Sequence, residues 1–230
     1  MNLRHLAFVL VAVFLVAPVA TAQWYENFDS YELGSGLIGQ GGWEGWDGSP
    51  DFDGFVSDDY AYSTPHSAQI IGTSDLIHQF TDYTSGAWVT TAWVYVPMDF
   101  QGQSYFIMLN TYSHGGSDNN WSVQIMFDSA GIVESYPEAV QLPLIQGEWV
   151  ELRIEIDLDA DIQTCYYDDQ MLYQKSWVEG VSGGGVPNIA CIDLFGNAAT
   201  AVYYDDLSID EMGGTPVEDT TWGAVKALYR

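Results

Sequence analysis

Positive charge is scarce in this sequence. The 230 residues include 5 Lys and Arg against 32 Asp and Glu, which gives a formal net charge of −27. Proteins that bind nucleic acids or anionic membranes in a general way need basic patches. The composition therefore excludes both partners and leaves divalent cations and uncharged molecules as candidates. The acidic residues are spread along the chain, which is typical of a solvated surface whose charge salt can screen.

Cysteine is nearly absent as well, because the chain contains only Cys165 and Cys191. There is no CxxC motif and no Cys/His cluster, which argues against structural zinc and thiol redox chemistry. Both cysteines lie in β-like runs of a chain whose first residues predict export. A Cys165–Cys191 disulfide is therefore one prediction, and two buried free thiols are the alternative.

The sequence has one long apolar run, residues 6–19, close to its start. A short basic segment precedes the run, and Ala20-Thr21-Ala22 comes after it. This pattern predicts a secretory signal peptide over residues 1–22, cleaved after Ala22. The run is too short to cross a bilayer, which takes about 20 residues. We therefore expect a secreted, extracellular or cell-surface protein with no membrane span.

Helical periodicity is missing before residue 211. Short β-rich runs recur instead, separated by Gly, Pro, Asn and Asp, which is typical of a sandwich or jelly roll. One all-β domain, a two-sheet antiparallel β-sandwich, is predicted over residues 23–210. Residues 34–54 form a long Gly- and Trp-rich stretch without periodicity, which usually indicates a functional or metal-bound loop. Residues 211–230 are predicted to form a polar linker and a short C-terminal tail.

The clearest strand pattern lies in residues 148–173. From Val150 to Leu158 apolar and charged residues alternate, and a period of two indicates a half-buried strand. Turn residues come next at 159–161 and 168–169, with β-rich runs between and after them. The stretch therefore predicts an antiparallel meander with one apolar and one charged face.

Three segments resemble the concanavalin A-like (laminin-G-like) jelly rolls. Residues 149–157 read WVELRIEID and lead to Tyr166-Tyr167-Asp168-Asp169, which looks like the late meander of that fold, with Gln170 where Gly is usual. Residues 26–29 and 203–209 resemble the first and last strands of secreted carbohydrate-binding jelly rolls. The resemblance implies two packed antiparallel sheets, often a structural calcium ion and often sugar binding. It does not imply catalysis.

A calcium site is predicted where the first and last strands meet, because in the resembling modules the metal connects these strands. Asp205 lies two and four positions before Leu207 and Ile209, so in a regular strand the three side chains point to the same face. We therefore expect Asp205 to point inward, where a carboxylate must be paired or bound to metal. Calcium takes several oxygen ligands, often carboxylates. The alternative is a hydrogen bond from a tyrosine or the backbone. The predicted ligands are Glu26, Asp29, Asp205 and Asp206.

Aromatic side chains are the candidates for sugar stacking, although most tryptophans of a sandwich belong to its core. Trp93 and Tyr95 share a face opposite Ala92 and Val94, so one of the two sets is exposed or lies in a groove. Gln124 lies on the polar side of its run, with Ser122 and Met126, and is predicted to line a concave face. Trp121 is a further candidate for stacking. The predicted ligand-binding residues are Trp43, Trp46, Trp93, Tyr95, Tyr112 and Gln124.

An enzyme is the alternative function. Glu155-x-Asp157-x-Asp159 resembles the strand motif of laminarinase-type hydrolases, in which the outer two positions are glutamates. Here Asp159 replaces the second glutamate. Positions i and i+4 of a strand are about 13 Å apart at about 3.3 Å per residue, whereas retaining catalysis needs carboxyl groups about 5 Å apart. We therefore expect no glycosidase activity.

The sequence thus favours a secreted, non-catalytic module that binds a polysaccharide or cell-surface glycan and is stabilised by calcium. The first alternative is a polysaccharide-active hydrolase or lyase that uses Glu155 and Asp157. The second is a structural extracellular protein without a ligand.

Overall fold

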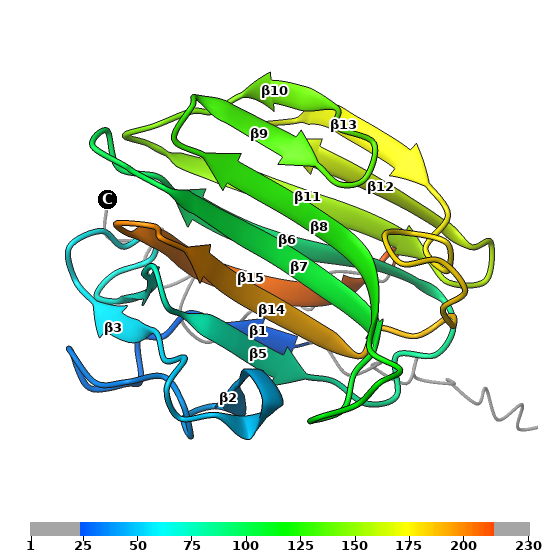
Figure 1. Cartoon of the computed structure of the whole chain (residues 1–230), viewed down its shortest axis with the longest axis horizontal. Helices are drawn as coiled ribbons and strands as arrows, with labels where there is room; N and C mark the ends of the chain where they lie inside the picture. Colours follow the sequence, from blue (N-terminus) through cyan, green and yellow to red (C-terminus); the bar gives the residue numbers. More distant parts are fainter. Residues whose placement is uncertain (1–23, 214–230) are drawn as a thin grey trace, which may run out of the picture.

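The computed structural model describes residues 24–213, and these form two antiparallel sheets stacked face to face (Figure 1). The predicted all-β, two-sheet sandwich is confirmed. The predicted signal peptide and nearly all of the predicted tail lie outside the described residues. Within those residues, no helix is long and apolar enough to cross a membrane.

The first sheet, called sheet A, has the strand order β13-β12-β11-β6-β15-β4-β3, and β1 pairs with β15. Its strands are β1 (Trp24–Glu26), β3 (Phe55–Ser57), β4 (Ser67–Ile70), β6 (Ala87–Tyr95), β11 (Trp149–Asp157), β12 (Ile162–Tyr167), β13 (Gln170–Lys175) and β15 (Val202–Glu211).

The second sheet, called sheet B, has the order β10-β9-β8-β7-β14-β5-β2. Its strands are β2 (Trp43–Gly45), β5 (Asp75–Gln79), β7 (Gln103–Thr111), β8 (Asn120–Asp128), β9 (Ile132–Ser135), β10 (Gln141–Pro143) and β14 (Cys191–Asn197). A 3-10 turn, η1 (Trp46–Gly48), comes directly after β2 inside the long Gly- and Trp-rich stretch.

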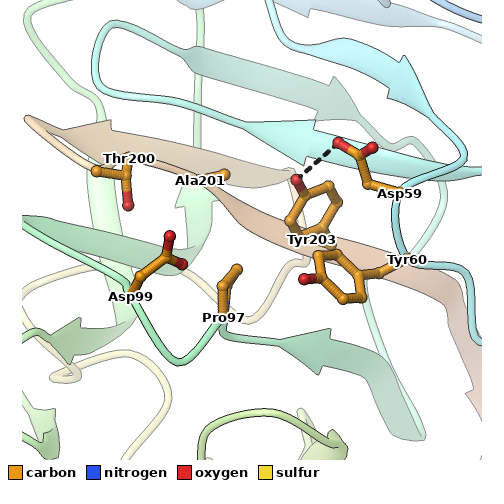
Figure 2. A pocket seen from close by; sticks show the side chains of 7 residues that line it. All are labelled: Asp59, Tyr60, Pro97, Asp99, Thr200, Ala201 and Tyr203. Atoms are coloured by element: carbon orange, nitrogen blue, oxygen red, sulfur yellow. Dashed lines mark hydrogen bonds between the residues drawn. The ribbon is translucent and has the colours of Figure 1, made fainter.

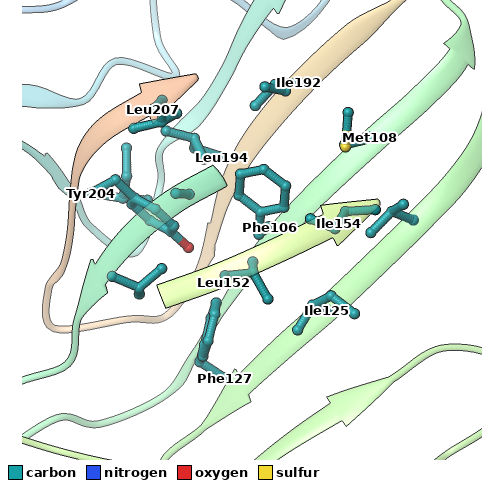
Figure 3. Close-up of a cluster of buried hydrophobic side chains, with 14 of the residues drawn as sticks. Phe106, Met108, Ile125, Phe127, Leu152, Ile154, Ile192, Leu194, Tyr204 and Leu207 are labelled. Atoms are coloured by element: carbon teal, nitrogen blue, oxygen red, sulfur yellow. The ribbon is translucent and has the colours of Figure 1, made fainter. Parts of the chain in front are cut away.

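The predicted meander is β11-β12-β13, and its alternation places one face of β11 in the core. The side chains of Val150, Leu152, Ile154 and Ile156 are buried, and the charged residues between them face outward. At roughly 1.5–3 kcal/mol for each fully buried aliphatic side chain, this strand anchors sheet A to sheet B. Figure 3 shows Leu152 and Ile154 against Phe106 and Ile125 of the opposite sheet.

A second, smaller apolar cluster lies on the outer face of sheet B. Its buried members are Ile77, Ile107, Leu109, Ala190 and Cys191, and Trp46, Tyr105, Tyr112, Trp121 and Phe195 pack against them. An outward sheet face that collects this many aromatic residues differs from the polar outer face usual in antiparallel sheets. This cluster determines where the candidate site lies.

Strand β15 departs from the predicted parity because it contains a β-bulge. Its pairing with β6 shifts between Asp205 and Ser208, and Asp206 has a positive φ of 44°. Tyr204 before the bulge and Leu207 after it both face the core, so Asp205 lies on the outer side of sheet A. The prediction that Asp205 points inward with Leu207 is therefore wrong, although the side chain is buried under the loop that precedes β4.

Candidate functional site

The aromatic residues predicted to bind sugar occupy three separate places. Trp43 is fully buried and packs against Phe28 and His78, so it belongs to the core rather than to a binding face. Trp93 and Tyr95 lie on the outer side of sheet A. The remaining candidates, Trp46, Tyr112 and Gln124, lie together on the outer side of sheet B.

The register of sheet B places three rows of side chains across its outer face. In order across the sheet, the rows are Gln79, Cys191, Leu109 and Trp121; then Glu44, Ile77, Asp193, Ile107 and Gln124; then Asp75, Phe195, Tyr105, Met126 and Glu134. Apolar residues fill most of this face, Asp193 lies at its centre, and the other polar residues lie at its margins.

Two tryptophans stand over this face. Trp46 of η1 and Trp121 of β8 are stacked with their ring centroids 5.8 Å apart and their planes 20° apart. Tyr112 meets Trp46 edge to face at 4.9 Å. Both tryptophans are partly exposed, so ring surface stays accessible to a ligand. The geometry is that of an aromatic platform, which can cover the apolar face of a flat ring.

A hollow of about 330 Å³, here called the tryptophan hollow, lies between these rings and the sheet. Its lining consists of Trp46, Asp75, Ile107, Trp121, Gln124, Asp193 and Phe195. Apolar walls with a few converging polar groups are the usual composition of a small-molecule site.

Asp75 and Asp193 form a hydrogen-bonded carboxyl pair in the hollow. Burial raises the pKa of Asp75 to about 6, against the lowering effect of the hydrogen bond from Asp193. Burial, the charge of Asp75 and the same hydrogen bond raise the pKa of Asp193 well above its ordinary value. The pair therefore holds a shared proton to higher pH than two separate aspartates would, and Asp193 is the carboxyl that is harder to ionise.

The position of Trp46 is fixed by polar contacts between η1 and the loop after β7. The hydroxyl of Tyr112 accepts a hydrogen bond from the backbone N–H of Asp47 at 2.9 Å, and the Asp47 carboxylate accepts one from Gly115 N at 2.8 Å. His114 Nε2 lies 2.9 Å from Glu44 Oε2, next to η1. These contacts hold the platform in place before any ligand arrives, which lowers the entropy cost of binding.

The outer side of sheet A carries a second aromatic surface. Tyr62 stacks on Trp93 at 3.9 Å and 11°, and Tyr60 stacks on Tyr95 at 4.0 Å and 22°. Beside them lies a pocket of about 310 Å³ lined by Asp59, Tyr60, Pro97, Asp99, Thr200, Ala201 and Tyr203. Figure 2 shows the Tyr203 hydroxyl donating to Asp59, at 3.2 Å. Here the loop tyrosines already cover the ring faces of Trp93 and Tyr95.

The carboxylates predicted for the enzyme alternative lie far from the tryptophan hollow. Glu155 is on the outer face of β11, where its carboxylate lies 3.4 Å from Arg153. Asp157 accepts a hydrogen bond from the backbone N–H of Ala160 and so fixes the turn after the strand. Their side chains point away from sheet B, and both have structural contacts.

The four predicted calcium ligands do not converge on one point. Glu26 accepts hydrogen bonds from Phe28 N at 2.8 Å and from the Tyr31 hydroxyl, and Asp29 accepts one from His66 N. Asp205 accepts hydrogen bonds from the backbone N–H groups of Tyr62 and Ser63. Asp206 accepts hydrogen bonds from the hydroxyls of Tyr25 and Ser63. Among the described residues, no group of three or more His, Cys, Asp or Glu side chains is placed to hold a metal ion.

Burial raises the pKa of the Asp205 carboxyl to about 8, with a further contribution from the charge of Asp206. Three hydrogen bonds from backbone N–H groups to this carboxyl lower its pKa, but by less than burial raises it. Backbone donors thus satisfy the Asp205 carboxyl in this structure.

The predicted disulfide is not formed, because Cys165 and Cys191 are both free and buried. Cys165 faces the main core from β12, whereas Cys191 belongs to the cluster on the outer face of sheet B. Two thiols on different sheets and different sides of sheet B cannot reach the short separation that a disulfide requires. The alternative of two buried free thiols is correct.

Sequence reasoning missed Asp75 and Asp193. Asp193 lies among apolar residues in a run that the sequence predicts as a strand, whereas Asp75 follows Ser74 directly before such a run. An acidic residue among apolar neighbours was the signal that could have identified Asp193. Asp75 carried no such signal. Their pairing could not be read from the sequence, because 118 positions separate them and only the β5–β14 register brings them together.

No protein-family model matches the chain. A search of curated proteins also finds no match.

Solved structures share the fold at low sequence identity. A sialidase aligns with a TM-score of 0.55 at 9% identity, over 84% of this chain and 19% of that chain. An endo-β-1,4-glucuronan lyase from the fungus Trichoderma reesei aligns with a TM-score of 0.51 at 11% identity, covering 82% of this chain and 95% of the lyase. The Crh5 transglycosylase, solved in complex with NAG, has a TM-score of 0.51 and 12% identity over 84% and 85% of the two chains. At these identities the likeness establishes the sandwich fold and nothing more specific.

Proposed function

We propose that this protein binds a polysaccharide chain across the outer face of sheet B, outside the cell, without cleaving it. The observation that carries the proposal is the tryptophan hollow, where two partly exposed indole rings stand over a buried carboxyl pair and Gln124. Indole faces cover the apolar faces of pyranose rings, and carboxyl and amide groups form hydrogen bonds with the hydroxyl groups of the sugar. The structurally similar proteins include a glucuronan lyase and a transglycosylase, which supports a carbohydrate ligand.

The absence of cleavage is part of the proposal. Retaining glycosidases place their two carboxyl groups about 5 Å apart, and inverting ones about 6.5–9.5 Å apart. Asp75 and Asp193 are in direct hydrogen-bond contact, which leaves no room for a sugar carbon or a water molecule between them. The pair can orient a ligand, but its geometry does not match either two-carboxylate mechanism.

Binding of the purified protein to a panel of soluble and insoluble polysaccharides tests the proposal. W46A and W121A are expected to weaken binding of the best ligand by at least about tenfold, equivalent to about 1.4 kcal/mol. The matched control is W93A, which removes an indole from the outer side of sheet A and should leave binding unchanged. Thermal melting of each variant separates loss of the platform from loss of the fold.

Three outcomes contradict the proposal. Binding to no polysaccharide rules it out, and binding that W93A abolishes while W46A and W121A do not moves the site to sheet A. Release of new reducing ends or unsaturated products, lost in D75N or D193N, shows an enzyme instead.

A further inference from the structure

The tryptophan hollow contains no positively charged side chain. Arg153 and Lys175 are the two Lys or Arg residues in the described part of the chain. Arg153 is bound to Glu151, Glu155 and Asp169 on sheet A, and Lys175 is bound to Glu138. A ligand that carries carboxylates or sulfates therefore meets no cation in the hollow and is opposed by the acidic surface.

Two buried carboxyl oxygens in the hollow have no donor beyond the proton that the carboxyl pair shares. They are Oδ1 of Asp75 and Oδ1 of Asp193, and the Asp193 residue is only 3% exposed. A buried acceptor without a donor is unfavourable because its bond to water is lost and not replaced. Both side chains line the hollow, so a ligand there can supply donors. The group that complements these carboxyl oxygens is therefore one that donates.

The pair also carries a negative charge that nothing nearby balances. The other ionisable groups that interact with it are Asp47, Cys191, Tyr112 and Tyr204, and Glu44 lies in the same row of the sheet; the carboxylates among them add negative charge. The imidazole of His114 contacts Glu44, and that of His78 contacts the carbonyl of Gly41. A buried charge is tolerated best when it is paired and hydrogen-bonded.

We propose that Asp75 and Asp193 receive a ligand ammonium group, so that the polysaccharide bound in the hollow is one with free amino groups, such as a glucosamine polymer. This inference rests on the proposed function and names the ligand class for the same site. An ammonium group brings three N–H donors and one positive charge. The donors can bind the two carboxyl oxygens, and the charge can balance that of the ionised carboxylate. A neutral diol supplies donors but leaves the charge unbalanced.

Proton release distinguishes the two kinds of ligand. When an ammonium group enters, its charge lowers the pKa of both carboxyls, so Asp193 ionises and its proton passes to the solvent. The ammonium keeps its own protons, and no covalent bond changes. A neutral sugar leaves the shared proton in place. Binding of an amino sugar is therefore expected to release about one proton per site, or more where Asp75 is still partly protonated.

The experiment is calorimetric titration of the full mature protein with three matched hexasaccharides. These are a fully deacetylated glucosamine hexamer, its N-acetylated form and a neutral glucose hexamer, each at pH ~5.5, where amines are protonated. EDTA removes divalent cations, and ~0.15 M salt screens general attraction between charges. Titrations in buffers of different ionisation enthalpy count the protons released. We expect the glucosamine hexamer to bind at least tenfold more tightly than the other two and to release about one proton or more.

Three variants separate the acid pair from the overall charge of the protein. D193N and D75N each remove one carboxyl of the pair, and we expect either to reduce the preference for the amine to within about threefold and to abolish proton release. D159N removes one exposed carboxylate from the β11–β12 turn of sheet A and should change neither result. Melting curves of all three confirm that the fold persists.

Each contrary outcome has a definite meaning. Equal or tighter binding of a neutral hexamer overturns the inference and leaves the proposed function intact. A preference for the amine that D193N and D75N do not reduce assigns it to the overall charge and also overturns the inference. If none of the three hexamers binds and no other polysaccharide does, both the inference and the proposed function fail.

Discussion

At the scale of single residues, buried carboxyl groups are the unusual feature of this molecule. Asp193 and Asp205 are buried and Asp75 is partly buried, and burial raises the pKa of each. Two of them line the proposed site. The third, Asp205, holds the loop before β4 through the backbone N–H groups of Tyr62 and Ser63. The same physical effect therefore acts at the proposed site in one place and at a structural contact in the other.

These raised pKa values predict how stability depends on pH. The folded protein binds more protons than the unfolded chain between the ordinary aspartate pKa of 3.8 and the raised value, which is about 8 for Asp205. The stabilisation is therefore fully present below pH 3.8 and is lost as pH rises to about 8. At about 1.4 kcal/mol per pKa unit, Asp205 alone accounts for a few kcal/mol.

Urea unfolding at several pH values checks this prediction. The large negative charge of the chain also lowers the stability of the fold as pH rises. The informative quantity is therefore the difference in this pH dependence between variants. D205N should flatten the decline between pH 4 and pH 8, whereas E148Q, which removes an exposed carboxylate, should leave the slope nearly unchanged. Equal slopes in D205N and the unaltered protein would contradict the role assigned to Asp205 burial.

At the scale of elements, tight contacts between loops fix the ends of the strands. The turn before β7 brings Gly102, with φ of 82°, against residues 198 and 199 before β15. A Cβ atom on Gly102 would lie 2.1 Å from the carbonyl oxygen of Ala198, which is backbone and cannot move away by rotation. Gly131, in the β8–β9 turn, has a similar φ of 87° but open space around its Cβ position.

Two alanine variants use this pair of glycines. G131A carries only the cost of a left-handed conformation, roughly 1–2 kcal/mol. G102A carries the same cost and a backbone clash, so we expect it to be less stable than G131A by a further ~1–3 kcal/mol. At roughly 2–4 °C per kcal/mol for a domain of this size, melting temperatures will separate the two. Equal melting temperatures would mean that the contact between residues 102 and 198 is loose.

At the scale of the whole molecule, four acidic residues fix the first and last strands of the sandwich to their surroundings through hydrogen bonds. Glu26, Asp29, Asp205 and Asp206 bind backbone and hydroxyl donors in separate groups around β1 and β15. Calcium binding remains a prediction from the sequence resemblance, without a converging ligand set among the described residues to support it.

Chelation tests this arrangement. Metal that binds only the folded state stabilises it by about 2.7 kcal/mol at a hundredfold excess over the dissociation constant. Because the four carboxylates already have protein donors, we expect the melting temperature to be the same in EDTA and in millimolar calcium. A clear fall in EDTA, restored by calcium, would show that a metal site forms after all.

The sequence alone determined the fold class and the inner face of the main strands. Alternation in residues 150–158 assigned β11 and its buried side, and turn residues marked the ends of the meander. These predictions succeeded because side-chain direction along a strand repeats every two residues and depends only on local geometry. The same rule failed at Asp205, because the bulge at Asp206 inserts a residue and reverses the parity of the rest of the strand.

Only the tertiary structure decided which residues share a site. Trp46, Gln124 and Tyr112 come together on sheet B, whereas Trp93 and Tyr95 lie on sheet A and Trp43 lies in the core. Asp75 and Asp193 meet because β5 and β14 are neighbours in sheet B. Pairing of strands so distant along the chain is set by how the two sheets pack together, and local periodicity contains no information about it.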